Sequence, residues 1–309
     1  LALPNFYDID NSAAAATVNE AMVRRGLNSV YGQTTLGYMD LVYLDLTARN
    51  DISSTLPEGN NSYFYPSASL SFVLSELDAV KDLGFLSFAK LRANYAEVGN
   101  SAPAYSVNTT YNILKPWSGL NRTSVPTQLN NPDLLPERTK SWEVGLDLNF
   151  IDNRIRFNMA YYNASTFDQI LPLTVSSASG YWSQYINAGE VNNKGIEAGL
   201  GLTPVKTKDF SWNIETNWYK NDNMVVSLGD QIDNILLFSA WDVSVNASEG
   251  EPYGAIKGTN YVYNDAGEPM VGEDGYPLIS ESEEVIGNIN PDWNAGISNE
   301  FRYKNISLK

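Results

Sequence analysis

The stretch WEVGLDLNF, residues 142–150, carries an apolar residue at every second position. Its apolar set is Trp142, Val144, Leu146, Leu148 and Phe150, which alternates with Glu143, Gly145, Asp147 and Asn149. A period of two residues is that of a β-strand with one apolar and one polar face. After a short turn at residues 151–153, the stretch IRFNMAY, residues 155–161, repeats the pattern. The two segments therefore predict an antiparallel hairpin.

The same alternation recurs along the chain and gives nine candidate strands, counting the segment before Tyr38. We expect an all-β chain whose strands pair antiparallel in sequential order, near residues 40–50, 62–74, 86–96, 138–150, 154–167, 193–203, 211–222 and 291–303. We expect one shared outward face that includes Val42, Leu44, Trp142, Val144, Leu146, Ile196, Leu200, Ile214 and Ile297.

Alternation alone fits both a soluble sandwich and a membrane barrel, because each has one apolar face. Three features favour the barrel. The strands have about 10 residues or more, as membrane-spanning strands require. Aromatic residues stand at the ends of the apolar faces, as at Trp142 and Phe150, where a membrane meets water. Short turns alternate with long connections, of which the longest are expected at residues 97–137, 168–192 and 223–290.

Composition narrows the function classes further. The chain has 309 residues with neither cysteine nor histidine, which excludes disulfides, thiol nucleophiles, histidine-containing triads and the usual zinc sites. Its 20 basic and 36 acidic residues give a net charge of −16, so nucleic acid is not an expected partner. Fourteen of the acids lie between residues 226 and 300, against Lys257 alone, which is typical of solvated loops.

The predicted barrel is incomplete. An odd number of strands does not suit a bacterial single-chain barrel, and residues 306–309 read as the start of a further strand. Since an open barrel would expose unpaired backbone to lipid, we expect the chain to be a piece of a longer polypeptide.

Several phrases of the sequence resemble the TonB-dependent outer-membrane transporters of the SusC/RagA type from Bacteroidetes-like bacteria. They are RNDISSTLP at 49–57, SYFYPS at 62–67, LRANYAEVGN at 91–100, NPDLLPE at 131–137, NAGEVNNKGIE at 187–197 and IGNINPDW at 286–293. The resemblance covers most of the chain, in the family's order.

This resemblance implies that residues 1–309 are part of a large transmembrane β-barrel with short periplasmic turns and long extracellular loops. It implies outer-membrane import of an oligosaccharide or peptide, with a SusD-like surface lipoprotein as partner and TonB engaged through a missing N-terminal part. The plug domain and the final barrel strands have no counterpart in this sequence. The alternative is a secreted or surface-bound all-β adhesin that binds glycans or peptides.

The sequence offers little for catalysis or for a metal or cofactor, and we predict none of these. The carboxylate pairs Glu249/Glu251, Glu273/Asp274 and Glu283/Glu284 lie in glycine-rich loops with no apolar pocket indicated. The acids near residues 264–277 lack the spacing of a calcium-binding helix–loop–helix and read instead as turns of a small β-appendage.

Aromatic residues among amides and hydroxyls in the long loops are the candidate ligand contacts, because flat rings suit sugar faces and peptides. The candidate residues are Tyr181, Trp182, Trp117, Trp241 and Tyr253. The adjacent pair Tyr181 and Trp182 is the strongest, with Gln184 and Asn187 close by to supply hydrogen bonds. The other interpretation is that these rings pack the loops together or contact a partner.

Overall fold

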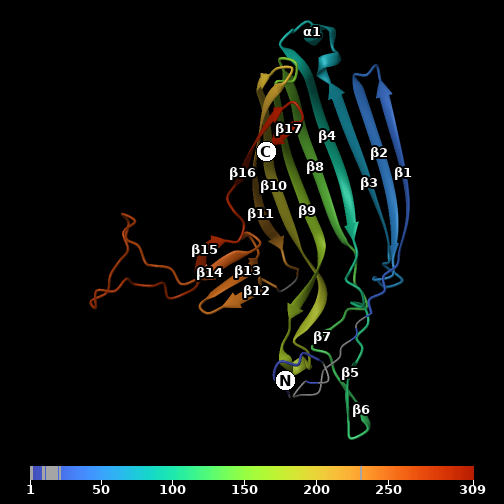
Figure 1. Ribbon diagram of the computed structural model, residues 1–309. Helices are drawn as coiled ribbons and strands as arrows, with labels where there is room; N and C mark the ends of the chain where they lie inside the picture. Colours follow the sequence, from blue (N-terminus) through green and yellow to red (C-terminus); the bar gives the residue numbers. More distant parts are fainter. Residues whose placement is uncertain (1–2, 9–10, 12–19, 21, 230–231) are drawn as a thin grey trace.

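A computed structural model describes residues 3–8, 11, 20, 22–229 and 232–309 of the chain. It consists of one large curved antiparallel sheet with extended loops at one end (Figure 1). The sheet contains β1 (Leu27–Tyr38), β2 (Val42–Ser53), β3 (Ser62–Val73), β4 (Leu86–Asn100), β8 (Glu137–Phe150), β9 (Ile155–Thr174), β10 (Ser183–Lys206), β11 (Phe210–Ser227), β16 (Asn294–Tyr303) and β17 (Ile306–Leu308). Among the described residues, no helix is long and apolar enough to cross a membrane.

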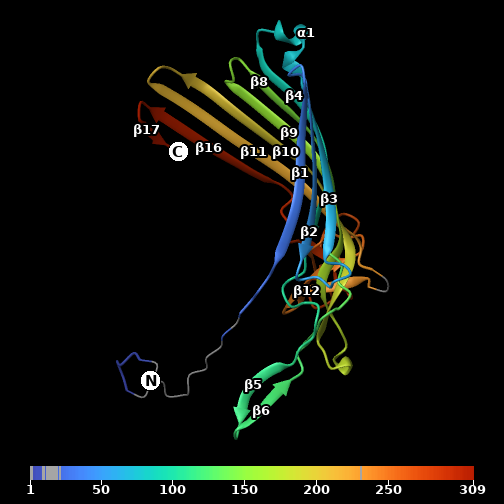
Figure 2. The same cartoon turned by 90° about the vertical axis from the view of Figure 1, so that its right-hand side faces the viewer.

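The sheet order follows the sequence, β1-β2-β3-β4-β8-β9-β10-β11-β16-β17, and every pair along it is antiparallel. This confirms the predicted sequential pairing. Figure 2 shows the sheet as a curved, open wall, and among the described residues β1 and β17 end it without meeting. The chain thus forms a segment of a barrel.

The register confirms that the predicted outward residues share one face. Opposed residues of an antiparallel pair point to the same side, and the pairs run Leu44–Leu70, Leu70–Ala93, Ala93–Val144, Val144–Tyr161 and Tyr161–Ile196 across five strand boundaries. Trp142 and Val144 are 43% and 44% exposed, so no second sheet covers this face as a sandwich would require.

Aromatic pairs lie at both ends of the apolar face. At one end the rings of Trp142 and Tyr161 lie 5.5 Å apart, and at the other those of Phe85 and Phe150 lie 6.3 Å apart and those of Trp212 and Phe301 5.6 Å. These are the two aromatic levels expected where strands enter and leave a bilayer.

The opposite face of the wall carries charged side chains, several of which form ion pairs with one another. Lys90 lies 3.2 Å from Asp147, Arg92 pairs with Glu143, and Arg156 pairs with Glu215. Pairing neutralises charge on the side that faces the barrel lumen.

Connections at one end are short and at the other long. The short end holds the turns after β1, β8, β10 and β16, together with η2 (Leu74–Glu76) and α1 (Asp78–Lys81) between β3 and β4. The long end holds a hairpin of β5 (Asn112–Trp117) and β6 (Leu120–Ser124), β7 (Gln128–Leu129), η3 (Ser177–Ser179), and a second sheet of β12 (Asn234–Ala240), β13 (Val243–Ser248), β14 (Ala255–Gly258) and β15 (Glu284–Asn288).

Two of the predicted loops are wrong in extent. Most of the loop predicted at residues 168–192 is strand, because β9 continues to Thr174 and β10 begins at Ser183. Beyond the membrane both faces of these strands meet water or other loops, so the alternation that identifies a strand fades there. The loop predicted at 223–290, of which residues 230–231 lie outside the described part, contains the four-stranded sheet β12–β15.

The strands β9 and β10 bend where they leave the barrel wall. Asp168 and Gly189 both have positive φ, 56° and 79°, and they fall between the opposed pairs Ala188–Gln169 and Glu190–Phe167. A Cβ on Gly189 would lie 2.6 Å from the Ser227 carbonyl oxygen, so only glycine fits. The resulting hairpin above the bend, residues 168–189, is called the rim hairpin below.

Candidate functional site

The side chain of Asn187 fastens the loop of residues 101–136 to the rim hairpin. Its amide group pairs with the backbone of the loop as a neighbouring strand would. The amide oxygen of Asn187 accepts the backbone N–H of Leu135 at 2.8 Å, and its Nδ2 donates to the Leu135 carbonyl at 2.9 Å. The same Nδ2 donates to the Asp168 carbonyl at 2.9 Å. Asn187 therefore joins the loop to the bend of the wall, whereas the sequence suggests a hydrogen-bonding role toward a ligand.

Glu137 makes the second fastening. Its Oε1 accepts the backbone N–H of Ile170 at 2.9 Å, and its Oε2 accepts Nδ2 of Asn100 at 2.8 Å. The carbonyl of Leu134 accepts Nδ2 of Asn60, which belongs to the loop between β2 and β3. Residues 131–137, NPDLLPE, thus connect the loop of residues 101–136 with the rim hairpin and with the loop between β2 and β3.

The side chain of Leu134 anchors this junction. It is fully buried in a cluster with Leu56, Tyr63 and Ala102, against which Tyr65, Ile170 and Tyr185 pack. We name this group, Leu56, Tyr63, Ala102 and Leu134, the rim core. Burial of a leucine contributes roughly 1.5–3 kcal/mol, so the rim core gives the loops a fixed position on the wall.

Replacing Asn187 by aspartate should release the loop. The isosteric carboxylate cannot donate to the two carbonyls and is repelled by them, so we expect a local cost of about 1–3 kcal/mol. Amide hydrogen exchange should then speed up at Leu135 and its neighbours. Asn192→Asp is a matched control, because the Asn192 amide bonds Asn163 and Ser165 on its own wall and no loop residue. Unchanged exchange at Leu135 would contradict the fastening role.

Fastening the loop creates a small hollow beside Tyr181. Strand β7 pairs in parallel with Ser183 and Gln184 of β10, and the Trp182 N–H donates to the Thr127 carbonyl at 2.7 Å. The hollow has a volume of about 180 Å³ and is lined by Thr109, Thr110, Tyr111, Val125, Pro126 and Tyr181. It combines two phenol rings, two hydroxyls and an apolar edge, which is chemistry that suits a sugar ring or a peptide segment.

Of the five predicted rings, only Tyr181 lines this hollow. Trp182 is 70% exposed on the rim hairpin, and Trp117 is 67% exposed on the β5–β6 hairpin with the Arg122 guanidinium 5.8 Å from its ring. Trp241 is 98% exposed in the tight turn between β12 and β13. The structure therefore does not gather the five rings into one site.

Tyr253 lies in a core of its own. It packs against buried Val191, Val225 and Leu228, where the wall meets the second sheet, and burial raises the pKa of its phenol. Its backbone N–H donates to Asn223 at 2.8 Å. The ring thus helps to hold the second sheet on the wall.

Sequence reasoning missed Tyr111. The segment NTTYN, residues 108–112, interleaves an aromatic residue with amides and hydroxyls, which is the pattern that singled out Tyr181. Tyr111 is 69% exposed and faces the same hollow as Tyr181, from a segment about seventy residues away along the chain.

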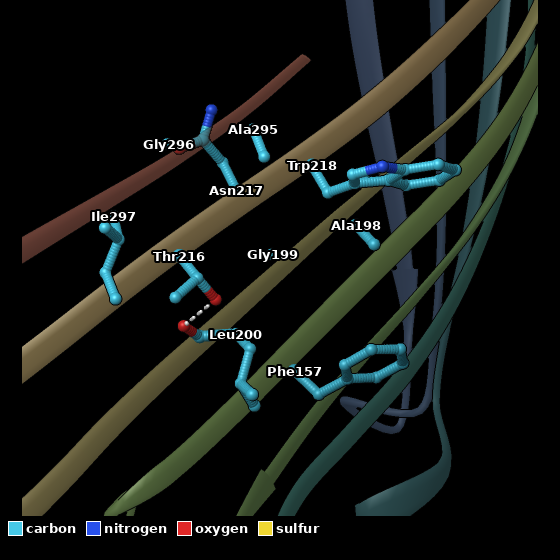
Figure 3. Close-up of a pocket in the computed structure, with 10 residues that line it drawn as sticks. All are labelled: Phe157, Ala198, Gly199, Leu200, Thr216, Asn217, Trp218, Ala295, Gly296 and Ile297. Carbon is cyan, nitrogen blue, oxygen red and sulfur yellow. Dashed lines mark hydrogen bonds between the residues drawn. The ribbon is translucent and has the colours of Figure 1, made fainter. Parts of the chain in front are cut away.

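The apolar face carries a different kind of depression, seen in Figure 3. Phe157, Leu200, Trp218 and Ile297 surround the small residues Ala198, Gly199, Ala295 and Gly296, and Thr216 Oγ1 donates to the Leu200 carbonyl at 3.0 Å. It lies on β9, β10, β11 and β16, on the face that carries Trp142 and Tyr161, and is lined almost entirely by apolar groups.

The carboxylate pairs do not form a cleft. Glu273, Asp274 and Glu283 are exposed on the arm between β14 and β15, and Glu284 is exposed at the start of β15. Glu251 pairs with Lys257 at 2.9 Å. Within the described part of the chain, acidic side chains nowhere gather in a group of three that could hold a metal ion.

A family model described as "TonB dependent receptor-like, beta-barrel" matches residues 3–305. The chain belongs to this receptor family. TonB-dependent receptor barrels lie in the outer membrane, so the apolar face of the wall is the face that meets lipid and the long loops form the extracellular rim.

Similar curated proteins are named TonB-dependent receptors, and a similar solved structure shares the fold. TonB-dependent receptor P3 of Formosa agariphila is 28% identical over 331 residues, covering 98% of this chain and 33% of the relative. TonB-dependent receptor SusC of Bacteroides thetaiotaomicron is 26% identical over 307 residues, covering 92% of this chain and 30% of the relative. The RagAB peptide importer in the "closed-closed" state aligns with a TM-score of 0.77 at 22% identity, over 91% of this chain and 32% of that one. The chain thus spans about a third of the length of the curated relatives it matches.

Proposed function

We propose that the receptor to which this wall belongs imports an oligosaccharide or a peptide across the outer membrane. The observation that carries the proposal is the combination of a lipid-facing wall with large, fixed loops at its extracellular end. The peptide class is supported by one similar structure, which is described as a peptide importer, and the oligosaccharide class is what the resemblance to SusC/RagA-type transporters implies. Energy would come through TonB, engaged by parts of the polypeptide outside this chain.

The hollow between Tyr111 and Tyr181 is the proposed ligand contact of this wall. The fastening by Asn187 and Glu137 holds it in place, so little order has to be created on binding. The proposal is tested by titrating defined oligosaccharides and peptides into the complete purified receptor, and by uptake of the same compounds into cells with and without it. Absence of binding to both compound classes would contradict it.

The double change Tyr111→Ala with Tyr181→Ala should weaken ligand binding about tenfold or more, because each buried ring that stacks on a ligand contributes a kilocalorie or more. Trp182→Ala joined to Tyr181→Ala tests the pair expected from sequence, and Tyr181 should account for most of its effect. Trp241→Ala is the control, since its ring touches nothing on the wall. Equal affinity of the double variant and the unchanged receptor would remove the hollow from the binding site.

We also propose that the exposed arm of residues 259–283 contacts a SusD-like lipoprotein lid. Tyr261, Tyr263 and Tyr276 on this arm are 52%, 49% and 73% exposed, and the arm extends away from the wall in Figure 1. Exposed rings on an extended segment are typical of an interaction surface. Co-purification of a lid with the complete receptor should be lost when residues 262–278 are replaced by a short turn, while the barrel still folds.

A further inference from the structure

Two lysines stand on the lipid-facing side of the wall, just outside the aromatic level. Lys194 of β10 and Lys220 of β11 share the face of Tyr161 and Trp218, because Ile196 is opposite both Tyr161 and Lys220 in the register. Both lysines are exposed. The two lysines therefore place positive charge at the level where the bilayer meets water, although the chain as a whole is acidic, with 36 acidic and 20 basic residues.

The two lysines open onto one small hollow. Its volume is about 140 Å³, and it is lined by Tyr161, Lys194, Gly195, Ile196, Lys220 and Asp222. The Lys220 Nζ lies 3.4 Å from Asp222 Oδ1, and within the described residues Lys194 has no carboxylate in ion-pair range. The negative charge of Asp222 repels an anion, but Lys194, Lys220 and Asp222 together carry a net charge of +1.

The apolar depression of Figure 3 continues this hollow toward the membrane interior. Ala198 follows Ile196 on the outer face of β10, and Trp218 precedes Lys220 on the same face of β11. The depression has a volume of about 410 Å³, and its lining residues Ala198, Gly199, Ala295 and Gly296 leave space between Phe157, Leu200 and Ile297. A cationic pocket thus lies directly outside an apolar one, with the two in line along β10 and β11.

We propose that this face binds a phosphate-bearing lipid of the outer leaflet, with its phosphate at Lys194 and Lys220 and an acyl chain in the apolar depression. Charge complementarity selects an anionic head group, and the adjoining apolar surface selects an amphiphile over a free ion. Lys140 is exposed on the same face of β8, where Glu97 lies opposite it in the register. The site is independent of the imported ligand, because it lies on the opposite face from the lumen.

The test uses the complete receptor in micelles, with phosphatidic acid as the probe and bound lipid counted by native mass spectrometry. Lys194→Gln with Lys220→Gln should lower the affinity for phosphatidic acid roughly 10- to 30-fold. The variant Lys194→Arg with Lys220→Arg keeps both positive charges and should bind phosphatidic acid as tightly as the unchanged receptor does. Lys208→Gln, which removes one exposed cation at the short-turn end, is the control and should bind normally. Thermal unfolding of each variant shows that the barrel is intact.

A second variant tests the apolar half with both lysines present. Ala198→Phe fills the depression and should lower phosphatidic acid binding while leaving the barrel folded. Equal lipid binding by the unchanged receptor and the Lys194→Gln/Lys220→Gln variant would overturn the proposal. So would competition by inorganic phosphate at the concentration of the lipid, since the site would then be one for free anions.

Discussion

Replacing Leu146 by arginine is expected to lower the free energy of unfolding of the barrel by about 2–4 kcal/mol. Leu146 lies on the lipid-facing side, opposite Leu91 and Met159, and midway along β8 between Trp142 and Phe150. A guanidinium at this depth cannot reach water at either aromatic level. The measurement is a urea refolding titration of the complete receptor in lipid vesicles.

Two controls separate charge in lipid from other effects of this substitution. Leu146→Met keeps an apolar side chain of similar volume and should be close to neutral. Asn158→Arg places the same guanidinium on the lumenal side, opposite Asp147, and should cost far less. If Leu146→Arg unfolds at the same urea concentration as the unchanged barrel, the facing of the wall is wrong.

Replacing Leu134 by alanine should detach the loop of residues 101–136 from the wall. Leu134 is fully buried, and removing a buried leucine side chain costs about 2–5 kcal/mol through lost burial and the cavity left behind. Because the rim core is separate from the strand hydrogen bonds, we expect local opening of the loops while the barrel stays folded. Ligand binding at the hollow of Tyr111 and Tyr181 should fall with it.

The neighbouring residue provides a matched control for Leu134→Ala. Leu135 is 40% exposed and is held through its backbone by Asn187, so Leu135→Ala keeps the fastening and should have a small effect. Amide hydrogen exchange across residues 101–136 is the measurement. Equal exchange in the two alanine variants would show that the rim core does not position the loop.

The sequence by itself determined the wall of this protein. Alternation in segments such as residues 142–150 follows from a bilayer on one side and water on the other, and each strand reports it independently of its neighbours. For the same reason the facing of Val144, Ile196 and Leu200 and the order of the strands could be predicted. The phrase NPDLLPE could be assigned to a family, but the pattern of its residues did not reveal what Leu134 and Glu137 contact.

Only the tertiary structure decided how the extracellular rim is built. Asn187 and Leu135 are 52 positions apart, and the contact between them depends on the bend at Asp168 and Gly189, which brings the rim hairpin against the loop. Above the membrane, water and other loops surround the strands on both faces. Apolar and polar residues therefore do not alternate there, and the sequence does not show how far these strands extend or what they contact. Tyr111 and Tyr181 line one hollow for the same reason: the pairing of β7 with β10 that brings their segments together is long-range, and local periodicity does not encode it.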